Sequence, residues 1–290
     1  MVRIERLLLL PANTANPLII QTHMKPIRQI LRRTGPWLFS FILLLSGCAT
    51  VPETGRSALR LMPEAQLEAM ASSSFAQMRQ EMPVSNNPEY NRRVQRVGHR
   101  IASVVRNELP DTVWEFVVFE DDSINAFAMP GGYVGFNTGM FRIIETDDEL
   151  AVVMGHEVAH VVARHGNERV SQQLLISGAG LALALGTRNM DRTDREIFLA
   201  AFGAGSTIGF LLPFSRHHEA EADEMGLFYM ARAGYDPRAA ITFWQKMEAE
   251  SRGGVPEFLS THPSGHRRIQ LLQSLMPRAV AEYERAIAGR

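Results

Sequence analysis

The 290-residue chain contains a single cysteine, Cys48, so a disulfide within the chain is excluded. The N-terminal region also lacks an apolar run long enough to span a bilayer, because residues 37–45 fall short of the roughly 20 that a spanning helix needs. Residues 48–290 hold 24 basic and 30 acidic side chains, which argues against nucleic acid as a partner. These 243 residues suffice for one domain with a sizeable core.

The lone cysteine ends the sequence Leu45-Ser46-Gly47-Cys48, which resembles the lipobox of bacterial lipoproteins. Basic residues precede the apolar run, as in a secretory signal whose translation starts at Met24. We therefore expect residues 1–47 to be a signal peptide, rather than a transmembrane anchor. By this resemblance Cys48 carries acyl chains, and more than one chain gives stable membrane attachment.

The residue after the cysteine bears on location. Ala49, in place of an aspartate, suggests sorting to the outer membrane, so we expect a lipid anchor on the periplasmic face of that membrane in a Gram-negative bacterium. Residues 48–60 would then form a tether, and residues 61–290 a single catalytic domain.

The sequence His156-Glu157-Val158-Ala159-His160 is the H-E-x-x-H pattern of zinc peptidases. Two histidines four residues apart lie on one face of an α-helix, so both imidazoles can bind one Zn²⁺ while Glu157 acts as general base. Thr146 and Glu149 form a capping-box pattern, and apolar residues follow at helical spacing. The sequence predicts one buried helix over residues 147–165.

A catalytic zinc usually has three protein ligands, so a third must lie elsewhere. The metzincin pattern is excluded, because Ala163 and Gly166 stand where it requires glycine and histidine. Residues 215–223 offer Glu219 and Asp223 one helical turn apart. Glu219 can bind zinc while Asp223 holds a zinc-binding histidine by its other ring nitrogen.

Four segments together resemble the zinc endopeptidase family of the CAAX prenyl proteases, the HtpX heat-shock protease, the mitochondrial Oma-type proteases and certain bacterial periplasmic lipoproteins. The resemblance covers residues 91–276. The segments are residues 125–132, residues 155–160 with Arg164-His165, residues 215–223, and Thr261-His262-Pro263 with Arg268.

This resemblance implies an α+β, predominantly helical fold of the zincin type (gluzincin), with a small sheet or hairpin beside the zinc helix. It implies one Zn²⁺ per chain, bound by His156, His160 and Glu219, with Glu157 as the base and Asp223 behind a ligand. Glu221 is the nearest competitor of Glu219.

His262 and Arg268 are candidates for stabilising the negative charge of the transition state. In relatives the corresponding histidine lies near the zinc, where it can occupy the fourth site and keep the enzyme latent. The alternative for His262 is an ordinary loop residue before proline. We interpret the remaining histidines of this half as solvated or structural: His165, His217, His218 and His266.

Two extended segments are predicted before the zinc helix, at residues 113–119 and 127–136, the second bent at Pro130-Gly131-Gly132. The strand beside the cleft can pair with an extended substrate through main-chain hydrogen bonds, or it can be a hairpin that only packs on the core. The resemblance favours a substrate-binding edge made of Asn125, Ala126, Phe127 and Ala128.

Apolar runs at residues 174–186 and 197–214 lie between the two zinc motifs. We expect them to form buried, closely packed helices, and the alternative is a surface that leans on the membrane. Further helices are predicted at residues 237–250 and 266–287. No 34-residue period follows, so a helical-repeat domain is not expected.

Three functions fit these observations. The first is a lipid-anchored periplasmic zinc endopeptidase that hydrolyses misfolded or misassembled envelope proteins. The second is a chaperone or assembly factor for outer-membrane proteins whose proteolysis is latent, because His262 caps the metal. The third is a non-catalytic lipoprotein scaffold, against which the intact Glu157 and the full ligand set weigh.

Overall fold

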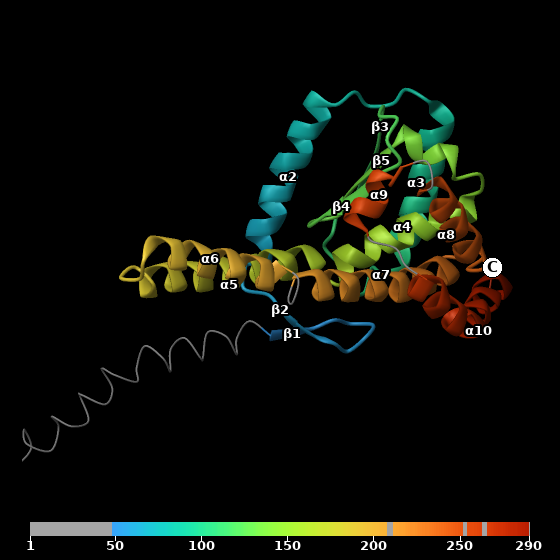
Figure 1. The fold of residues 1–290 in the computed structure, drawn as a ribbon. Helices are drawn as coiled ribbons and strands as arrows, with labels where there is room; N and C mark the ends of the chain where they lie inside the picture. Colours follow the sequence, from blue (N-terminus) through green and yellow to red (C-terminus); the bar gives the residue numbers. More distant parts are fainter. Residues whose placement is uncertain (1–47, 208–210, 252–253, 263–265, 290) are drawn as a thin grey trace, which may run out of the picture. The chain divides into compact units, whose positions relative to one another are not determined.

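The computed structural model describes residues 48–207, 211–251, 254–262 and 266–289 (Figure 1). The signal peptide expected over residues 1–47 lies outside the described residues, as does the side chain of Cys48. The elements run in the order β1 (Cys48–Thr50), β2 (Ser57–Leu59), α2 (Glu64–Glu81), α3 (Pro88–Val104), β3 (Glu115–Phe119), β4 (Ala126–Met129), β5 (Tyr133–Asn137), η1 (Thr138–Arg142), α4 (Asp147–Val162), α5 (His165–Gly186), α6 (Arg192–Ser206), α7 (Leu212–Arg232), α8 (Ala239–Glu250), α9 (Glu257–Thr261) and α10 (His266–Ala288).

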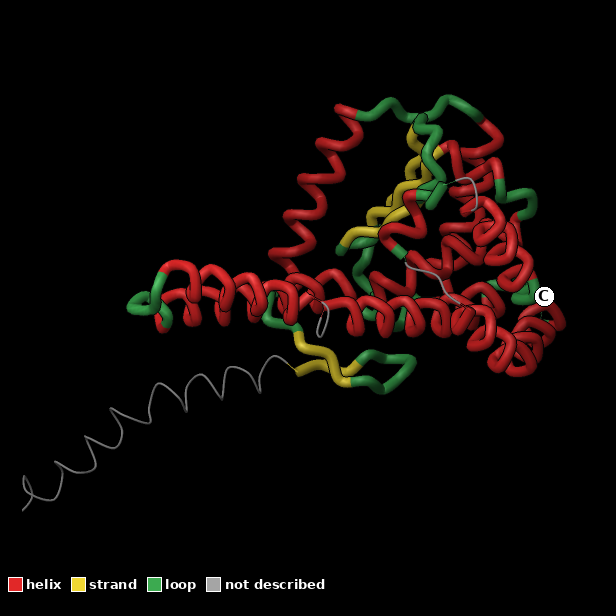
Figure 2. The backbone as a smooth tube through the Cα atoms, in the orientation of Figure 1, coloured by secondary structure: helices red, strands yellow, loops and turns green. Residues whose placement is uncertain are grey.

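Helices dominate the described part of the chain, and one small sheet lies among them (Figure 2). The predicted α+β, mainly helical fold class is confirmed. Helices α8 and α10 confirm the two helices predicted after the second zinc motif, with α8 beginning two residues later than expected.

Helix α4 carries the H-E-x-x-H sequence through the centre of the core. Thr146 caps its start, since the side chain accepts a hydrogen bond from the Glu149 backbone while the Glu149 carboxylate accepts one from Thr146. Every residue from Glu149 to Val162 is buried. The helix ends three residues before the predicted end, because Arg164 adopts a left-handed conformation with φ of 58°.

Helices α4 and α7 touch through their backbones. A Cβ atom placed on Gly155 would lie 2.7 Å from the Gly226 carbonyl oxygen, and one on Gly226 would lie 2.7 Å from the His156 backbone nitrogen. Only glycine at both positions allows so close an approach. This contact brings the second zinc motif, on α7, beside the first.

The sheet has the strand order β3-β5-β4. Strand β3 pairs with β5 in parallel, and β4 pairs with β5 in antiparallel register, with Ala126 opposite Phe136. The predicted bend is confirmed, since Gly131 and Gly132 connect β4 to β5 with positive φ angles of 88° and 91°. One face of the sheet contacts α3 and α4, and Phe75 of α2 packs with Phe119 and Phe127 on the other.

Helices α5 and α6 correct one expectation. The first turns of α5 are buried, but the apolar run that follows is largely exposed, and no residue of α6 is buried. Gly180 lies close to Phe202, so the two helices do pack against each other. The interpretation of both runs as buried helices was wrong, because small residues produce close pairing without requiring burial. Among the described residues, none of the helices has the length and apolar character that crossing a membrane requires.

Residues 48–60, interpreted from the sequence as a tether, contain the antiparallel hairpin of β1 and β2. Val51, within the hairpin, has no exposed surface. Strand β2 contacts α5, and the Leu61 backbone donates a hydrogen bond to the Ser171 hydroxyl of that helix. The hairpin therefore packs on the helix that follows the zinc motif.

Candidate metal centre and active site

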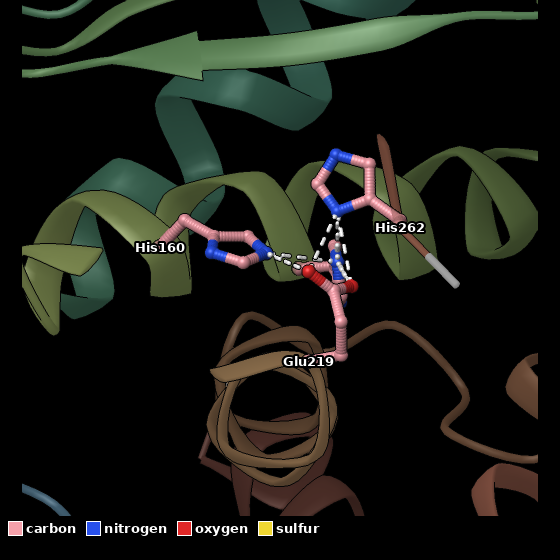
Figure 3. A group of neighbouring side chains, drawn as sticks. His160, Glu219 and His262 are labelled. Carbon is pink, nitrogen blue, oxygen red and sulfur yellow. Dashed lines mark hydrogen bonds and ion pairs between the residues drawn. The ribbon is translucent and has the colours of Figure 1, made fainter. Parts of the chain in front are cut away.

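Four buried side chains converge on one point, as Figure 3 shows for three of them. His156 and His160 come from α4, Glu219 from α7, and His262 from the residue after α9. Their ligand atoms all lie within 4.8 Å of one another. His156 Nε2 lies 3.2 Å from Glu219 Oε2, and His160 Nε2 lies 3.5 Å from Glu219 Oε1.

These separations fit a tetrahedral zinc site. Ligand atoms about 2.0–2.1 Å from a tetrahedral zinc lie roughly 3.3 Å from one another. His156 Nε2 and His160 Nε2 are 3.1 Å apart, and His262 Nδ1 lies 3.0 Å from Glu219 Oε2. Imidazole nitrogens with one carboxylate are also the donor types that zinc prefers. The residues present therefore fit the metal.

Asp223 holds His156 from behind. His156 Nδ1 lies 3.0 Å from Asp223 Oδ1, so a proton on Nδ1 leaves Nε2 facing the centre of the cluster. Burial lowers the pKa of His156, but the hydrogen bonds with Asp223 and Glu219 outweigh it and raise the pKa to about 9. Metal binding at Nε2 must therefore displace a proton near neutral pH.

Arg268 lies on the same side as Asp223, away from the cleft. Its Nε and one terminal nitrogen donate to the two oxygens of Asp223, and its guanidinium carbon lies 3.6 Å from the centre of the Trp244 ring. The same terminal nitrogen is 3.4 Å from Glu219 Oε2. The structure thus places this candidate transition-state residue behind the ligands, where it holds Asp223.

His262 is the fourth member of the cluster. Its ring stacks on Phe258 with 4.6 Å between ring centres, and its backbone nitrogen donates to the Phe258 carbonyl at 2.8 Å. Only 7% of the residue is exposed, so it is not a solvated loop side chain.

Glu157 follows His156 on α4 and faces the cleft. Its Oε1 has no hydrogen-bond partner in the described part of the chain, and His262 Nε2 lies 3.5 Å away. Burial raises the pKa of this carboxyl, and the neighbouring histidines partly oppose that rise. A carboxylate with a free oxygen and a raised pKa is suited to accept a proton.

A cleft of about 180 Å³ opens beside these groups. Glu157, His160 and His262 lie along it, and β4 forms a wall. Of the substrate residues expected from the sequence, Asn125, Phe127 and Ala128 line the cleft, whereas Ala126 is fully buried in the core. The Asn125 amide donates to Glu257 at 3.0 Å, which joins β4 to the start of α9.

The backbone of β4 offers free groups on its outer side. The Asn137 nitrogen donates to the Asn125 carbonyl, so in the antiparallel ladder the alternating partners Phe127 and Met129 also face β5. The backbone groups of Ala128 therefore point away from β5. In the described sheet β4 is an edge strand.

Glu221, the competitor for the third ligand, is not part of the cluster. Its carboxylate instead lies 3.0 Å from His165 Nε2 and accepts from Arg56. Glu219, two residues earlier, is the α7 carboxylate that reaches the two zinc-motif histidines.

Comparison with known proteins decides the family. A model of Peptidase family M48 matches residues 88–276. The chain belongs to peptidase family M48.

Several relatives of this M48 chain have names that state an activity. It is 35% identical over 221 residues to the mitochondrial metalloendopeptidase OMA1 of Schizosaccharomyces pombe, covering 74% of this chain and 62% of that protein. It is 31% identical over 225 residues to the beta-barrel assembly-enhancing protease of Escherichia coli K12, covering 76% and 46%. It is 34% identical over 196 residues to a putative protease of the same name from Vibrio cholerae, covering 66% and 40%. The chain thus spans less than two thirds of each of these relatives.

Membership of M48 confirms the resemblance that the sequence motifs carried, and it makes zinc the cofactor of this site. Sequence reasoning missed one feature of the M48 site. His165, interpreted as solvated or structural, is 1% exposed and its Nδ1 lies 2.8 Å from His160 Nδ1. The only signal in the sequence was its place beside Arg164 in one of the segments that carry the family resemblance. His218 is buried too, His217 is exposed, and the side chain of His266 lies outside the described residues.

Proposed function

We propose that this chain is a lipid-anchored zinc endopeptidase of the bacterial envelope, which hydrolyses peptide bonds in misfolded or misassembled envelope proteins. The observation that carries the proposal is Glu157: its Oε1, which has no hydrogen-bond partner among the described residues, lies beside a four-residue metal cluster at a cleft lined by the edge strand β4. A scaffold that had lost its activity would have no need of a buried, unpaired carboxylate at this point.

Each residue of the site has a part in this hydrolysis. When bound, zinc supplies Lewis acidity for the scissile carbonyl and for the attacking water. Glu157 takes a proton from the water and passes it to the leaving amine, so a covalent intermediate is not required. His156, His160 and Glu219 hold the metal, and Asp223 with Arg268 orients His156.

The free edge of β4 supports the hypothesis that the substrate binds as an extended peptide. A peptide that adds to an edge strand gains main-chain hydrogen bonds, which depend little on its side chains. Such pairing needs a segment of substrate that is not already folded. The preference for misfolded or misassembled proteins follows from this requirement.

Two sequence features support the compartment. The lipobox-like sequence ending at Cys48 supports attachment to the periplasmic face of the outer membrane, and the bacterial relatives carry the name of a beta-barrel assembly-enhancing protease. The mitochondrial relatives are named for another compartment. Mass spectrometry of the N-terminal peptide tests the anchor. An acylated Cys48 supports it, and an unmodified cysteine in the membrane fraction refutes it.

A second candidate function is favoured by His262. Its Nδ1 lies 3.1 Å from His156 Nε2 and 3.0 Å from Glu219 Oε2, where it can take the fourth zinc position. A site capped in this way is latent, and the protein then acts mainly as a chaperone or assembly factor for outer-membrane proteins. Displacement of His262 would open the site for water and substrate.

The test compares three proteins: the chain from Ala49, its Glu157→Gln variant and its His262→Ala variant. Zinc content and casein cleavage are measured side by side. We expect one zinc per chain in all three, cleavage that Glu157→Gln abolishes, and faster cleavage in His262→Ala. Zinc without cleavage in every protein favours the chaperone function, and a chain without zinc refutes the ligand assignment.

A further inference from the structure

A second buried polar network adjoins the metal cluster, on the side of His160 that faces away from Glu219. His160 Nε2 points to the cluster, and its other nitrogen, Nδ1, lies 2.8 Å from His165 Nδ1. The two rings meet at 73° with 4.9 Å between their centres. Each ligand histidine therefore has a partner behind it, but for His160 the partner is an imidazole rather than a carboxylate.

The break between α4 and α5 allows the rings of His160 and His165 to contact each other. On an unbroken helix, residues five apart point about 140° away from each other, since each residue turns by about 100°. Arg164 interrupts the helix in a left-handed conformation, which is unfavourable for a residue other than glycine. Two contacts hold this conformation: the Arg164 guanidinium lies 2.7 Å from Glu64, and Arg60 donates to the Ala163 carbonyl at 3.1 Å.

The hydrogen-bond directions follow from metal binding. A neutral imidazole that offers Nε2 to a metal keeps its proton on Nδ1, so His160 donates and His165 accepts at Nδ1. His165 then carries its own proton on Nε2, which lies 3.0 Å from Glu221 Oε2.

The hairpin of β1 and β2 fixes the far end of the network. Arg56 Nε donates to Glu221 at 2.8 Å, and the Thr54 hydroxyl donates to the other oxygen of the same carboxylate. Arg56 also forms a two-point contact with Glu168, at 2.7 Å for each nitrogen. His218 lies beside this series rather than within it, since its Nε2 lies 3.1 Å from Glu168 and its ring stacks on His165.

We propose that His165 is a positioning residue for the zinc ligand His160, and that Arg56 and Thr54 of the N-terminal hairpin fix it through Glu221. This inference rests on the proposed zinc site. It joins Thr54 and Arg56 of the hairpin to His160 through a continuous series of hydrogen bonds. His165 does not touch substrate; it sets the proton position and the ring orientation of a ligand.

The experiment uses variants of the full chain and measures zinc affinity by competition with a chromophoric chelator. His165→Phe keeps a ring and removes the acceptor, and we expect zinc affinity to fall about 10- to 100-fold, as for other partners of metal-bound histidines. His165→Asn retains an acceptor near the Nδ1 position and should recover most of that loss. Arg56→Met should weaken zinc several-fold, because Glu221 loses its guanidinium partner.

His218→Phe is the matched control. His218 is as buried as His165 and stacks on it at 4.3 Å, but it does not belong to the metal cluster. We expect His218→Phe to lower the melting temperature of the metal-free protein and leave zinc affinity within twofold. Absorption spectra of the Co²⁺-substituted proteins add a second readout, since a purely structural role would leave the ligand-field bands unchanged.

Equal zinc affinity in wild type and His165→Phe would overturn the positioning role. Equal losses in His165→Phe and His218→Phe, without recovery in His165→Asn, would also overturn it. Zinc binding without casein cleavage in both the wild type and His262→Ala refutes the proposed peptidase, whereas a loss of zinc affinity in His165→Phe and Arg56→Met but not in His218→Phe still supports the positioning role. A wild-type chain without zinc refutes both.

Discussion

The Asp223 carboxylate accepts hydrogen bonds from two nitrogens of the Arg268 guanidinium and a third from Nδ1 of His156. The guanidinium lies over the Trp244 ring, so the buried Asp223 carboxylate is held between a cation and His156. Fixing the ligand in this way raises its basicity toward the metal.

Removing this carboxylate charge should weaken zinc binding. Asp223→Asn keeps the shape of the side chain but weakens both hydrogen bonds, so zinc affinity should fall about 10- to 100-fold. Chelator competition measures the change. Asp236→Asn, at a carboxylate outside the metal cluster and partnered by Arg238, serves as the control and should leave zinc affinity unchanged. An unaltered zinc affinity in Asp223→Asn would show that the orientation of His156 does not depend on Asp223.

Gly226 should not tolerate a side chain. In Gly226→Ala the new methyl group would lie 2.7 Å from the His156 backbone nitrogen, so α4 and α7 must separate. We expect a loss of about 1–3 kcal/mol in the free energy of unfolding and a reduced zinc content, because Glu219 moves away from the histidines. Denaturant titration and metal analysis measure the two effects. Gly203→Ala on α6, where a Cβ meets no atom within 4 Å, is the control and should not destabilise the protein.

Acid should destabilise the metal-free protein through Glu168. Burial raises the pKa of this carboxyl, but His218 and Arg56 outweigh burial and lower it to about 2. Its contribution to stability is therefore complete above the unfolded pKa of about 4.5 and disappears as pH falls toward 2. Glu168→Gln should lose on the order of 1–3 kcal/mol at pH 6, and the difference from wild type should shrink steadily below pH 4.5. Urea titrations with a chelator present measure it, and a difference that stays constant with pH contradicts the prediction.

The backbone groups on the outer side of β4 should be needed for substrate cleavage but not for metal binding. Ala128→Pro removes the one N–H that points away from β5 at this position, and edge strands accept proline there. We expect kcat/KM for casein to fall at least tenfold with zinc content unchanged, since a lost substrate hydrogen bond leaves the metal ligands in place. Ala128→Val retains the N–H and serves as the control. Full activity in Ala128→Pro would exclude strand addition at this edge.

Local signals in the sequence predicted much of this site. The capping box of Thr146 and the spacing of His156 and His160 depend only on neighbours along one helix, so both could be recognised without a structure. The prediction of Glu219 as a ligand required the family motif as well, because the approach of this residue to α4 depends on a long-range contact. That contact rests on Gly226, whose role becomes visible only when the partner backbone is known.

The misses share a physical cause. The left-handed Arg164 has no residue signature of its own, since glycine or asparagine would be the usual choice there, and without it His165 would point elsewhere. The apolar runs of α5 and α6 gave a composition but no indication of what lies against them. That the two helices pair with each other and are exposed on their other faces follows from the tertiary arrangement, which composition does not specify.

The backbone contact at Gly155 and Gly226 also bears on how the metal enters. Since main chains rather than flexible side chains set the spacing of α4 and α7, the cluster is preorganised before zinc arrives. Zinc then binds without an accompanying folding step, and the heat-capacity change of binding should be small. His262 belongs to the cluster and also lines the cleft, so the proposed cap by this histidine would control the entry of the ion as well as that of the water.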